Sequence, residues 1–258
     1  MERYRDWLLE LGAPVTDENG ELIGIPFLTD RNSLFEPCGH RIAVDPGWRG
    51  SNTIKVIFER LFEAHGIPDA MRSDNGPPFA SPNGLMGLSR LSVWWLALGI
   101  DLERSRPACP QDNGAHERMH LDVRRELQAG RIGRDQQSFD LWRHEFNHIR
   151  PHESLGMKCP ADVWVPSTRT YSGTPDGLDY EGMETRKVSK TGIIMHFGAP
   201  IFLSSALAGW DVGLNPCRDS PLTEVRFVNL FMGHIDPATA SFRPASAGLK
   251  LAESSEIV

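Results

Sequence analysis

Two short stretches of this chain each place a carboxylate beside a turn, and they constrain how the chain can fold. Asp74 stands where the apolar segment 67–71 ends, and it leads directly into Asn75-Gly76. Glu117 stands near the start of a helical pattern that covers residues 114–128. Two carboxylates on different elements can converge to hold a divalent metal ion at a phosphodiester.

The length of 258 residues allows one large domain or two smaller ones. No apolar run reaches the roughly 18 residues that a membrane span needs, and residues 91–100, the longest run, indicate a buried helix. The first residues carry acid and lack a following apolar stretch, so they do not form a secretory signal. We therefore expect a cytoplasmic protein with no membrane partner.

The charge balance does not by itself suggest a nucleic-acid partner. The net charge is −7, whereas nucleic-acid binders are usually basic. Most of the 27 basic residues are arginines, however, and the arginine side chain suits bidentate phosphate contacts. The four cysteines are far apart and form no Cys-x-x-Cys pair, which favours reduced thiols over structural zinc.

Regular elements are predicted from capping residues and from hydrophobic periodicity. A hairpin turn is expected at residues 17–20, where Asp, Glu, Asn and Gly follow one another. Helices are predicted over residues 51–65, 84–98, 114–128 and 139–149, with short strands at 67–74 and 100–103.

A different pattern begins after a linker at residues 171–180, which is rich in Gly, Pro and Asp. Short alternating segments separated by turn formers predict a small β-barrel or sandwich in residues 181–236. Its strands are expected at residues 185–188, 192–197, 201–203, 209–214, 223–228 and 230–235. The tail over residues 237–258 is predicted to be disordered.

Helical spacing separates two faces of the predicted helix 114–128. Met119, Val123 and Leu127 recur every fourth residue and are predicted to form its packed face. Glu117, His120 and Arg124 fall on a different face. Elsewhere, two aromatic residues, Trp94 and Trp95, are predicted to be core residues, and Arg150 and His152 are predicted to tie the last helix to the core.

Three motifs resemble segments of retroviral-type integrase cores, as found in bacterial insertion-sequence transposases of the Asp-Asp-Glu superfamily. Residues 66–79, with Arg72-Ser73-Asp74-Asn75-Gly76, resemble the second-aspartate segment. Residues 107–120, with Gln111-Asp112-Asn113-Gly114-Ala115-His116-Glu117-Arg118, are similar to the third-carboxylate segment. Residues 146–161 resemble the closing motif, so the resemblance covers about residues 51–170.

The resemblance implies an α/β fold, an RNase H-like mixed sheet with flanking helices, and a small all-β domain over residues 181–236. It also implies cleavage and strand transfer of DNA phosphodiesters at an Asp-Asp-Glu site that binds Mg²⁺ or Mn²⁺. Asp74 would be the second carboxylate and Glu117 the third. Active enzymes of this type work as multimers on paired DNA ends, so self-association is expected.

Four further residues are candidates for contact with DNA. His120 and Arg124 lie about one helical turn apart on the face of Glu117, although a solvated helix face explains them equally well. Gln111 and Asn113, in the loop before Glu117, could touch DNA as well. Asn75 and Gly76 would shape the turn that presents Asp74.

The first aspartate of the family cannot be identified, because residues 1–50 diverge from the pattern. In the family that aspartate lies some 55 to 65 residues before the second, and a hairpin and a helix fill the interval. Asp17, Asp30 and Asp45 are candidates, but none has the expected surroundings. Enzymatic activity therefore stays open. The alternatives are an active transposase and a catalytically inactive remnant that binds only DNA or a partner transposase, and the missing aspartate favours the remnant. A non-catalytic interaction module on the same scaffold is the third alternative.

Overall fold

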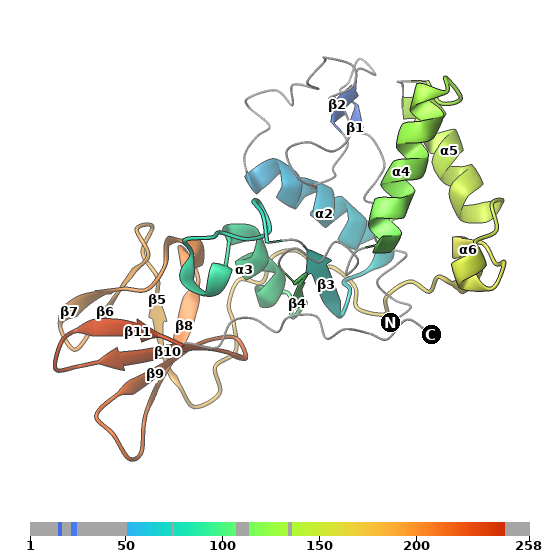
Figure 1. The fold of residues 1–258 in the computed structure, drawn as a ribbon. Coiled ribbons are helices and arrows are strands. Elements are labelled where there is room, and N and C mark those ends of the chain that lie inside the picture. Colours follow the sequence, from blue (N-terminus) through green and yellow to red (C-terminus); the bar gives the residue numbers. More distant parts are fainter. Residues whose placement is uncertain are drawn as a thin grey trace. The chain divides into compact units, whose positions relative to one another are not determined.

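The chain forms two compact units, one made of residues 1–68 and 108–171 and the other of residues 69–107 and 172–258. The computed structural model describes residues 15–16, 22–24, 51–73, 75–106, 114–133 and 136–245. The described elements of the first unit are mainly helices, and those of the second are mainly strands (Figure 1). None of the described helices is both long enough and apolar enough to cross a membrane. The mixed α/β class expected from the sequence is confirmed.

The first unit begins with a hairpin and a helix. Strands β1 (Val15–Thr16) and β2 (Leu22–Gly24) pair antiparallel on either side of the predicted turn. Helix α2 (Ser51–His65) has the predicted bounds and buries Phe58 and Phe62. The helix ends at Gly66, whose φ of +81° is left-handed and whose Cβ position would lie 2.7 Å from the Ser167 carbonyl oxygen. A side chain there would be both strained and crowded.

The segment that closes the first unit holds the end of α2 in place. The backbone N–H of Ser167 donates to the His65 carbonyl at 3.0 Å, and the Ser167 hydroxyl donates to the Ile67 carbonyl at 2.5 Å. Arg169 donates from Nη1 to the Pro68 carbonyl at 2.9 Å. The bond to His65 satisfies a carbonyl group that the end of the helix leaves without a partner, and the other two bonds hold the residues that follow the helix.

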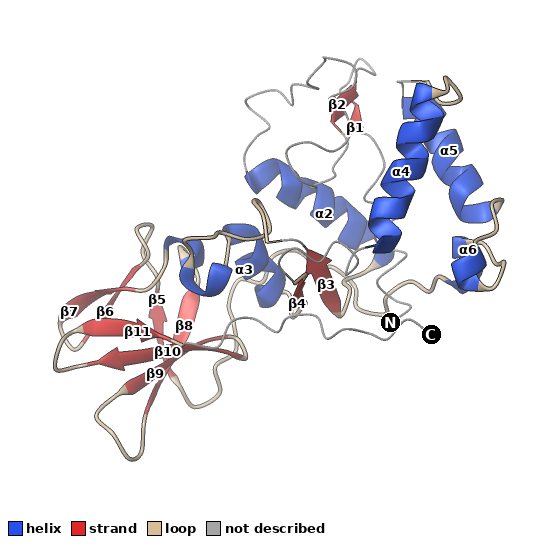
Figure 2. Ribbon diagram, in the orientation of Figure 1, coloured by secondary structure: helices blue, strands red, loops and turns tan. Residues whose placement is uncertain are grey.

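Helices α4 (Gly114–Gln128) and α5 (Gln136–His148) pack side by side (Figure 2). The bounds of α4 are those predicted, and α5 begins three residues before the predicted Phe139. A short helix, α6 (Pro160–Val163), contacts α5. The shared core of α4, α5 and their connection contains the buried residues Met119, Val123, Ile132, Phe139, Trp142 and Phe146, with Leu127 partly buried against them. The predicted packed face of α4 is therefore confirmed.

The second unit begins with two parallel strands joined by a helix. Strand β3 (Ala70–Ser73) pairs with β4 (Asp101–Arg104) in the register Ala70↔Asp101 to Ser73↔Arg104. Helix α3 (Arg90–Ala97) connects them and buries Trp94 and Trp95, which confirms that these are core aromatics. Because the strands are parallel, their carboxyl ends lie at the same edge.

The predicted helix at residues 84–98 is wrong at its start, because α3 begins only at Arg90. Residues Leu85–Gly87 form a separate 3₁₀ turn, η3, in which Met86 and Gly87 have positive φ. Ser89 is extended and forms a capping box with Ser92, so that each side chain accepts from the other residue's N–H. Such a cap sets the first turn of a helix at the residue that follows it.

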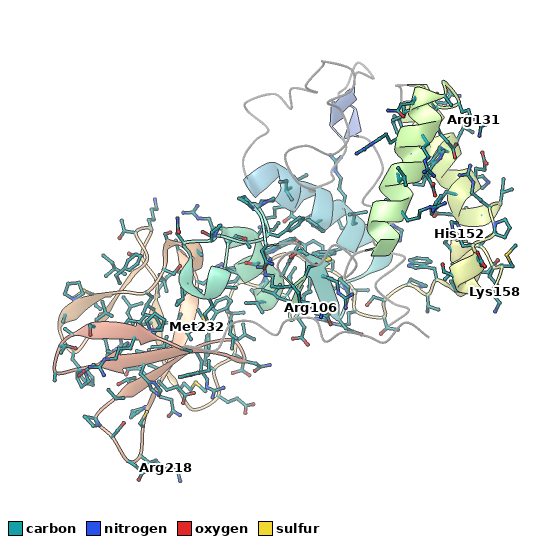
Figure 3. The ribbon with its side chains drawn as sticks, in the orientation of Figure 1. Arg106, Arg131, His152, Lys158, Arg218 and Met232 are labelled. Carbon is teal, nitrogen blue, oxygen red and sulfur yellow. The ribbon has the colours of Figure 1, made fainter. Side chains whose placement is uncertain are left out.

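The rest of the second unit is mainly antiparallel. Strands β5 (Glu184–Lys187), β8 (Asp211–Pro216), β9 (Thr223–Phe227), β10 (Leu230–Asp236) and β11 (Ser241–Pro244) form a five-stranded sheet in the order β11-β10-β9-β8-β5. Strands β6 (Ile193–His196) and β7 (Ala199–Phe202) form a separate hairpin, followed by the 3₁₀ turn η6 (Ser205–Leu207). The fully buried side chains of the five-stranded sheet include Val212, Leu214, Val225, Phe227, Met232 and Ile235, and Met232 is labelled in Figure 3.

The expectation that the chain is disordered from residue 237 is wrong for residues 241–244. These residues form β11, which pairs with β10 in the register Gly233↔Pro244 to Asp236↔Ser241. Strand β11 buries none of its side chains fully, so hydrophobic alternation gives no signal for it. Backbone hydrogen bonds to β10 hold it instead.

Tyr180 is a buried phenol that packs against strand β8 of this sheet. Its hydroxyl donates to the Asp211 carbonyl at 2.7 Å and accepts from the Val228 N–H at 3.3 Å. Its ring lies over Gly213, where a Cβ would come 2.5 Å from the ring. Desolvation by burial raises the pKa of Tyr180 to about 12.

This raised pKa predicts a loss of stability at alkaline pH. The folded state favours the neutral phenol, so the free energy of unfolding should fall as pH rises from about 10, the ordinary tyrosine pKa, to about 12. Tyr180→Phe should unfold more easily by about 1 kcal/mol at pH 7 and should lose less stability over the alkaline interval. Urea unfolding at pH 7, 10 and 11 measures this, with Tyr171→Phe as the control. An equal alkaline loss in Tyr180→Phe and the unaltered protein would contradict the prediction.

Candidate functional site

The predicted second-carboxylate segment lies at the carboxyl end of β3. The strand ends at Ser73, one residue before Asp74, and Asp74 itself lies outside the described residues. The Ser105 N–H donates to the Ser73 carbonyl at 3.0 Å, and Asn75 donates from Nδ2 to the Ser105 carbonyl at 2.8 Å. The residues on both sides of Asp74 are therefore bonded to the residue that follows β4.

The loop after Asp74 is held from within and from α3. The Ala80 N–H donates to the Gly76 carbonyl at 2.9 Å, which closes a turn. The Phe79 ring is buried and stacks on Trp95, with ring centroids 5.4 Å apart and planes inclined by 25°. That Asn75 and Gly76 shape the turn that presents Asp74 stays a prediction, because Asp74 lies outside the described residues.

Sequence analysis missed Arg104, a buried arginine at the end of β4. Its side chain is buried to the same extent as the core aromatics, with 4% exposed. It bonds to Ser73 and to Phe79. Side chains along a strand alternate between its two faces, so Leu102 and Arg104 lie on the same face. Because Leu102 is an apolar residue and is buried, this alternation could have predicted that Arg104 is buried as well.

Glu117 is the fourth residue of α4, in the first unit. An acidic side chain in the first turn of a helix interacts favourably with the helix dipole. The side chains of Glu117 and His120, and the whole of Gln111 and Asn113, lie outside the described residues. Their predicted roles stay predictions.

Arg124 is the one predicted site residue whose side chain is described. It is half-buried, and its Nε is buried without a hydrogen bond to any described residue. Met119 and Val123 fix the orientation of α4 against α5, so helical spacing places Glu117, His120 and Arg124 on a neighbouring face. Contact of Arg124 with DNA stays a prediction.

The described residues contain no group of three or more His, Cys, Asp or Glu side chains arranged to hold a metal ion. Asp74 and the Glu117 side chain lie outside that search, so the predicted metal site is not tested by it. The rings of His144 and His148 stack on α5 with centroids 4.8 Å apart. The described cysteines, Cys159 and Cys217, are free thiols, as expected.

Arg150 and His152 tie α5 to its surroundings, as predicted. Arg150 donates from Nη1 to Glu126 of α4 at 2.6 Å and from Nη2 to Glu145 of α5 at 2.8 Å. The bond to Glu126, with a smaller contribution from Glu145, raises the pKa of Arg150. The His152 ring, labelled in Figure 3, meets the Phe146 ring edge-on at 4.5 Å. Both residues are structural.

Removal of the Arg150 bridge is expected to destabilise the first unit. Arg150→Ala should lower the free energy of unfolding by roughly 1–2 kcal/mol, because a two-carboxylate bridge is lost but its side chain is partly exposed. Arg143→Ala is the matched control on α5, because its bond to Asp140 is long, at 3.4 Å, and lies at the surface. It should cost less than about 0.5 kcal/mol in urea unfolding. Equal losses in the two variants would contradict a special role for Arg150.

Residues 98–160 match the family model described as the integrase core domain. The chain is 32% identical over 124 residues to the insertion element IS476 uncharacterized 39.2 kDa protein of Xanthomonas euvesicatoria, a match that covers 46% of this chain and 34% of that protein. It is 26% identical over 125 residues to the insertion element IS407 uncharacterized 31.7 kDa protein of Burkholderia multivorans, covering 47% of this chain and 42% of that protein.

The Pro-Pol polyprotein of Simian foamy virus type 1 is 34% identical over 91 residues, which cover 35% of this chain and 7% of the polyprotein. The matches thus span about a third to two fifths of the length of the insertion-element proteins. The predicted resemblance to the integrase core of insertion elements is therefore confirmed.

Proposed function

We propose that this chain, which carries an integrase core segment of the insertion-element type, is a transposase that cleaves and joins DNA phosphodiesters with the help of a divalent metal ion. The observation that carries the proposal is the match over residues 98–160, which contains Glu117 in the first turn of α4. The placement of the two carboxylates on regular elements supports it, because β3 ends one residue before Asp74 and α4 begins three residues before Glu117.

Asp74 and Glu117 are the proposed metal ligands. Carboxylate oxygens are the donors that Mg²⁺ and Mn²⁺ prefer, so the donor set fits these ions. When bound, the metal would neutralise charge on the attacking and leaving oxygens of the phosphodiester. The first carboxylate of the triad would come from the N-terminal segment, where the candidates Asp17, Asp30 and Asp45 lie outside the described residues.

The remaining site residues are proposed to bind DNA. Gln111 and Asn113 precede α4, and His120 and Arg124 lie on the face of α4 that also carries Glu117. An arginine on this face suits a phosphate contact. Self-association on paired DNA ends, and action in the cytoplasm, belong to the same proposal.

The finer architecture is also a proposal. The parallel pair β3–β4 with α3 between them supports an RNase H-like sheet over residues 51–170. The hairpin β1–β2 and then α2 precede β3, which is the order of elements that the resemblance implies. The antiparallel strands after the linker at residues 171–180 support a small β domain over residues 181–236.

The proposal is tested by nicking and strand transfer in Mg²⁺ or Mn²⁺. The substrate is a supercoiled plasmid that carries the genomic DNA flanking the gene on both sides. Metal-dependent nicking at the flanks, followed by joining, is the expected result. A protein that unfolds cooperatively, binds the flanking DNA and does not nick it would instead be the inactive remnant, which is the alternative function.

A further inference from the structure

Arg104 is a buried cation that joins two points of one loop. It is the last residue of β4, and only 4% of it is exposed. Its Nη1 donates to the Ser73 hydroxyl at 2.8 Å, and its Nη2 donates to the Phe79 carbonyl at 2.7 Å. Burial of an arginine is costly unless its donors are bonded, so these contacts are part of what keeps it there.

The two acceptors of Arg104 bracket Asp74 in the sequence. Ser73 is covalently joined to Asp74 on one side, and Phe79 ends the loop on the other. Asn75, the next residue after Asp74, is bonded to the Ser105 carbonyl at 2.8 Å. Arg104 and Ser105 thus bind the chain immediately before Asp74, immediately after it, and at the far end of its loop.

The far end of the loop is also fixed to α3. The Phe79 carbonyl that accepts from Arg104 accepts from the Ser89 hydroxyl at 3.0 Å as well, and Ser89 is the N-cap of α3. The Phe79 ring stacks on Trp95 of the same helix. Through this carbonyl, the guanidinium connects the loop to both a strand and a helix.

We propose that Arg104 is a positioning residue for Asp74, and that it holds the loop 73–79 in the conformation that presents the carboxylate. The inference rests on the proposed function, because it assigns Arg104 to the same metal site. A planar guanidinium reaches two acceptors at once in a fixed fork, whereas a lysine ammonium is a compact point charge. The structure therefore calls for arginine at position 104.

The test compares Arg104→Gln and Arg104→Lys with the unaltered full chain. Amide hydrogen exchange of Asn75, Gly76, Phe79 and Ala80, the non-proline residues of this segment, reports the order of the loop. Mn²⁺ titration followed by electron paramagnetic resonance reports the metal site without any need for activity. Asp74→Asn defines the metal binding that depends on Asp74. Arg72→Gln is the matched control, because Arg72 joins the same two strands through Glu103, at 3.0 Å, one register position earlier.

In Arg104→Gln, exchange of the loop amides should accelerate at least 10-fold, and the half-saturating Mn²⁺ concentration should rise about 10- to 100-fold, the usual effect of losing a residue that orients a metal ligand. Arg104→Lys should fall between Arg104→Gln and the unaltered protein. Arg72→Gln should leave the half-saturating Mn²⁺ concentration within about 2-fold. Ser73→Ala should add little when combined with Arg104→Gln, because the two changes remove one shared bond.

Each other outcome overturns the inference. Unchanged loop exchange in Arg104→Gln would mean that Arg104 does not hold the loop. Faster exchange with unchanged Mn²⁺ affinity would mean that the loop does not position Asp74. If Mn²⁺ binding is lost in Asp74→Asn but kept in Arg104→Gln, the inference fails and the proposed function stands. If the unaltered protein shows no Mn²⁺ binding that depends on Asp74, the proposed function fails, and the role of Arg104 at that site fails with it.

Discussion

Glu117→Gln is expected to lower the rate of metal-dependent DNA nicking by more than about 100-fold, because even the loss of a residue that only supports a metal ligand costs 10- to 100-fold. The amide keeps the size of the side chain and removes its negative charge. Loss of a favourable charge near the start of α4 should change stability by less than about 1 kcal/mol. The defect should therefore appear in nicking of the flanking-DNA plasmid and not in thermal unfolding.

The matched control on the same helix is Asp122→Asn. Asp122 pairs with the exposed Arg118 at 3.4 Å, one turn earlier on α4. Asp122 lies five residues after Glu117, so the two residues are on different faces of the helix. It should nick DNA at the rate of the unaltered protein. Nicking by Glu117→Gln at that same rate would remove Glu117 from the site and leave the match over residues 98–160 as evidence of ancestry alone.

The helices that the sequence predicted best are those with a strong local signal at each end. Helix α2 begins at Ser51, one of the two residues predicted to cap it, and is followed by the left-handed Gly66, whereas α4 carries a regular four-residue apolar stripe. These signals act over a few residues, so they can be read without knowing the rest of the fold. The packed face of α4 was predicted from this stripe, and the structure shows that α5 packs against it.

The elements that were misplaced depend on backbone geometry or on distant partners. Helix α3 starts late because Met86 and Gly87 adopt positive φ before the capping box at Ser89, although most of the segment is apolar. Strand β11 was missed because it exists through pairing with β10 and has no buried face of its own. Tertiary pairing decides such cases, and composition does not record it.

In the candidate site, too, the residues with a local sequence signal were predicted and the residue that depends on distant partners was not. The sequence motifs indicated Asp74 and Glu117 as site residues. Hydrophobic periodicity and turn-forming residues correctly predicted that β3 ends beside Asp74 and that α4 begins just before Glu117. Arg104 was not predicted, because a charged residue in a short strand is normally assigned to solvent. Its acceptors lie 25 and 31 residues away, so only the folded chain brings them together.

Phe227→Ala is expected to cause the largest loss of stability among the changes considered, about 3–5 kcal/mol in the free energy of unfolding. The side chain lies on β9 with none of its surface exposed, and its ring meets Trp210 edge-on at 6.0 Å. Truncation to alanine removes the buried ring and leaves a cavity that the sheet can close only in part. Urea unfolding followed by near-ultraviolet circular dichroism measures the loss.

Phe202→Ala is the matched control, because it makes the same substitution in the same unit on β7, where 60% of the residue is exposed. It should cost less than about 1 kcal/mol, since little of its surface leaves water on folding. A large difference between the two variants means that the strands after residue 180 share a packed core, as a stable β domain requires. Similar small losses would mean that this sheet does not contribute to cooperative unfolding, and the proposed domain over residues 181–236 would have to be abandoned.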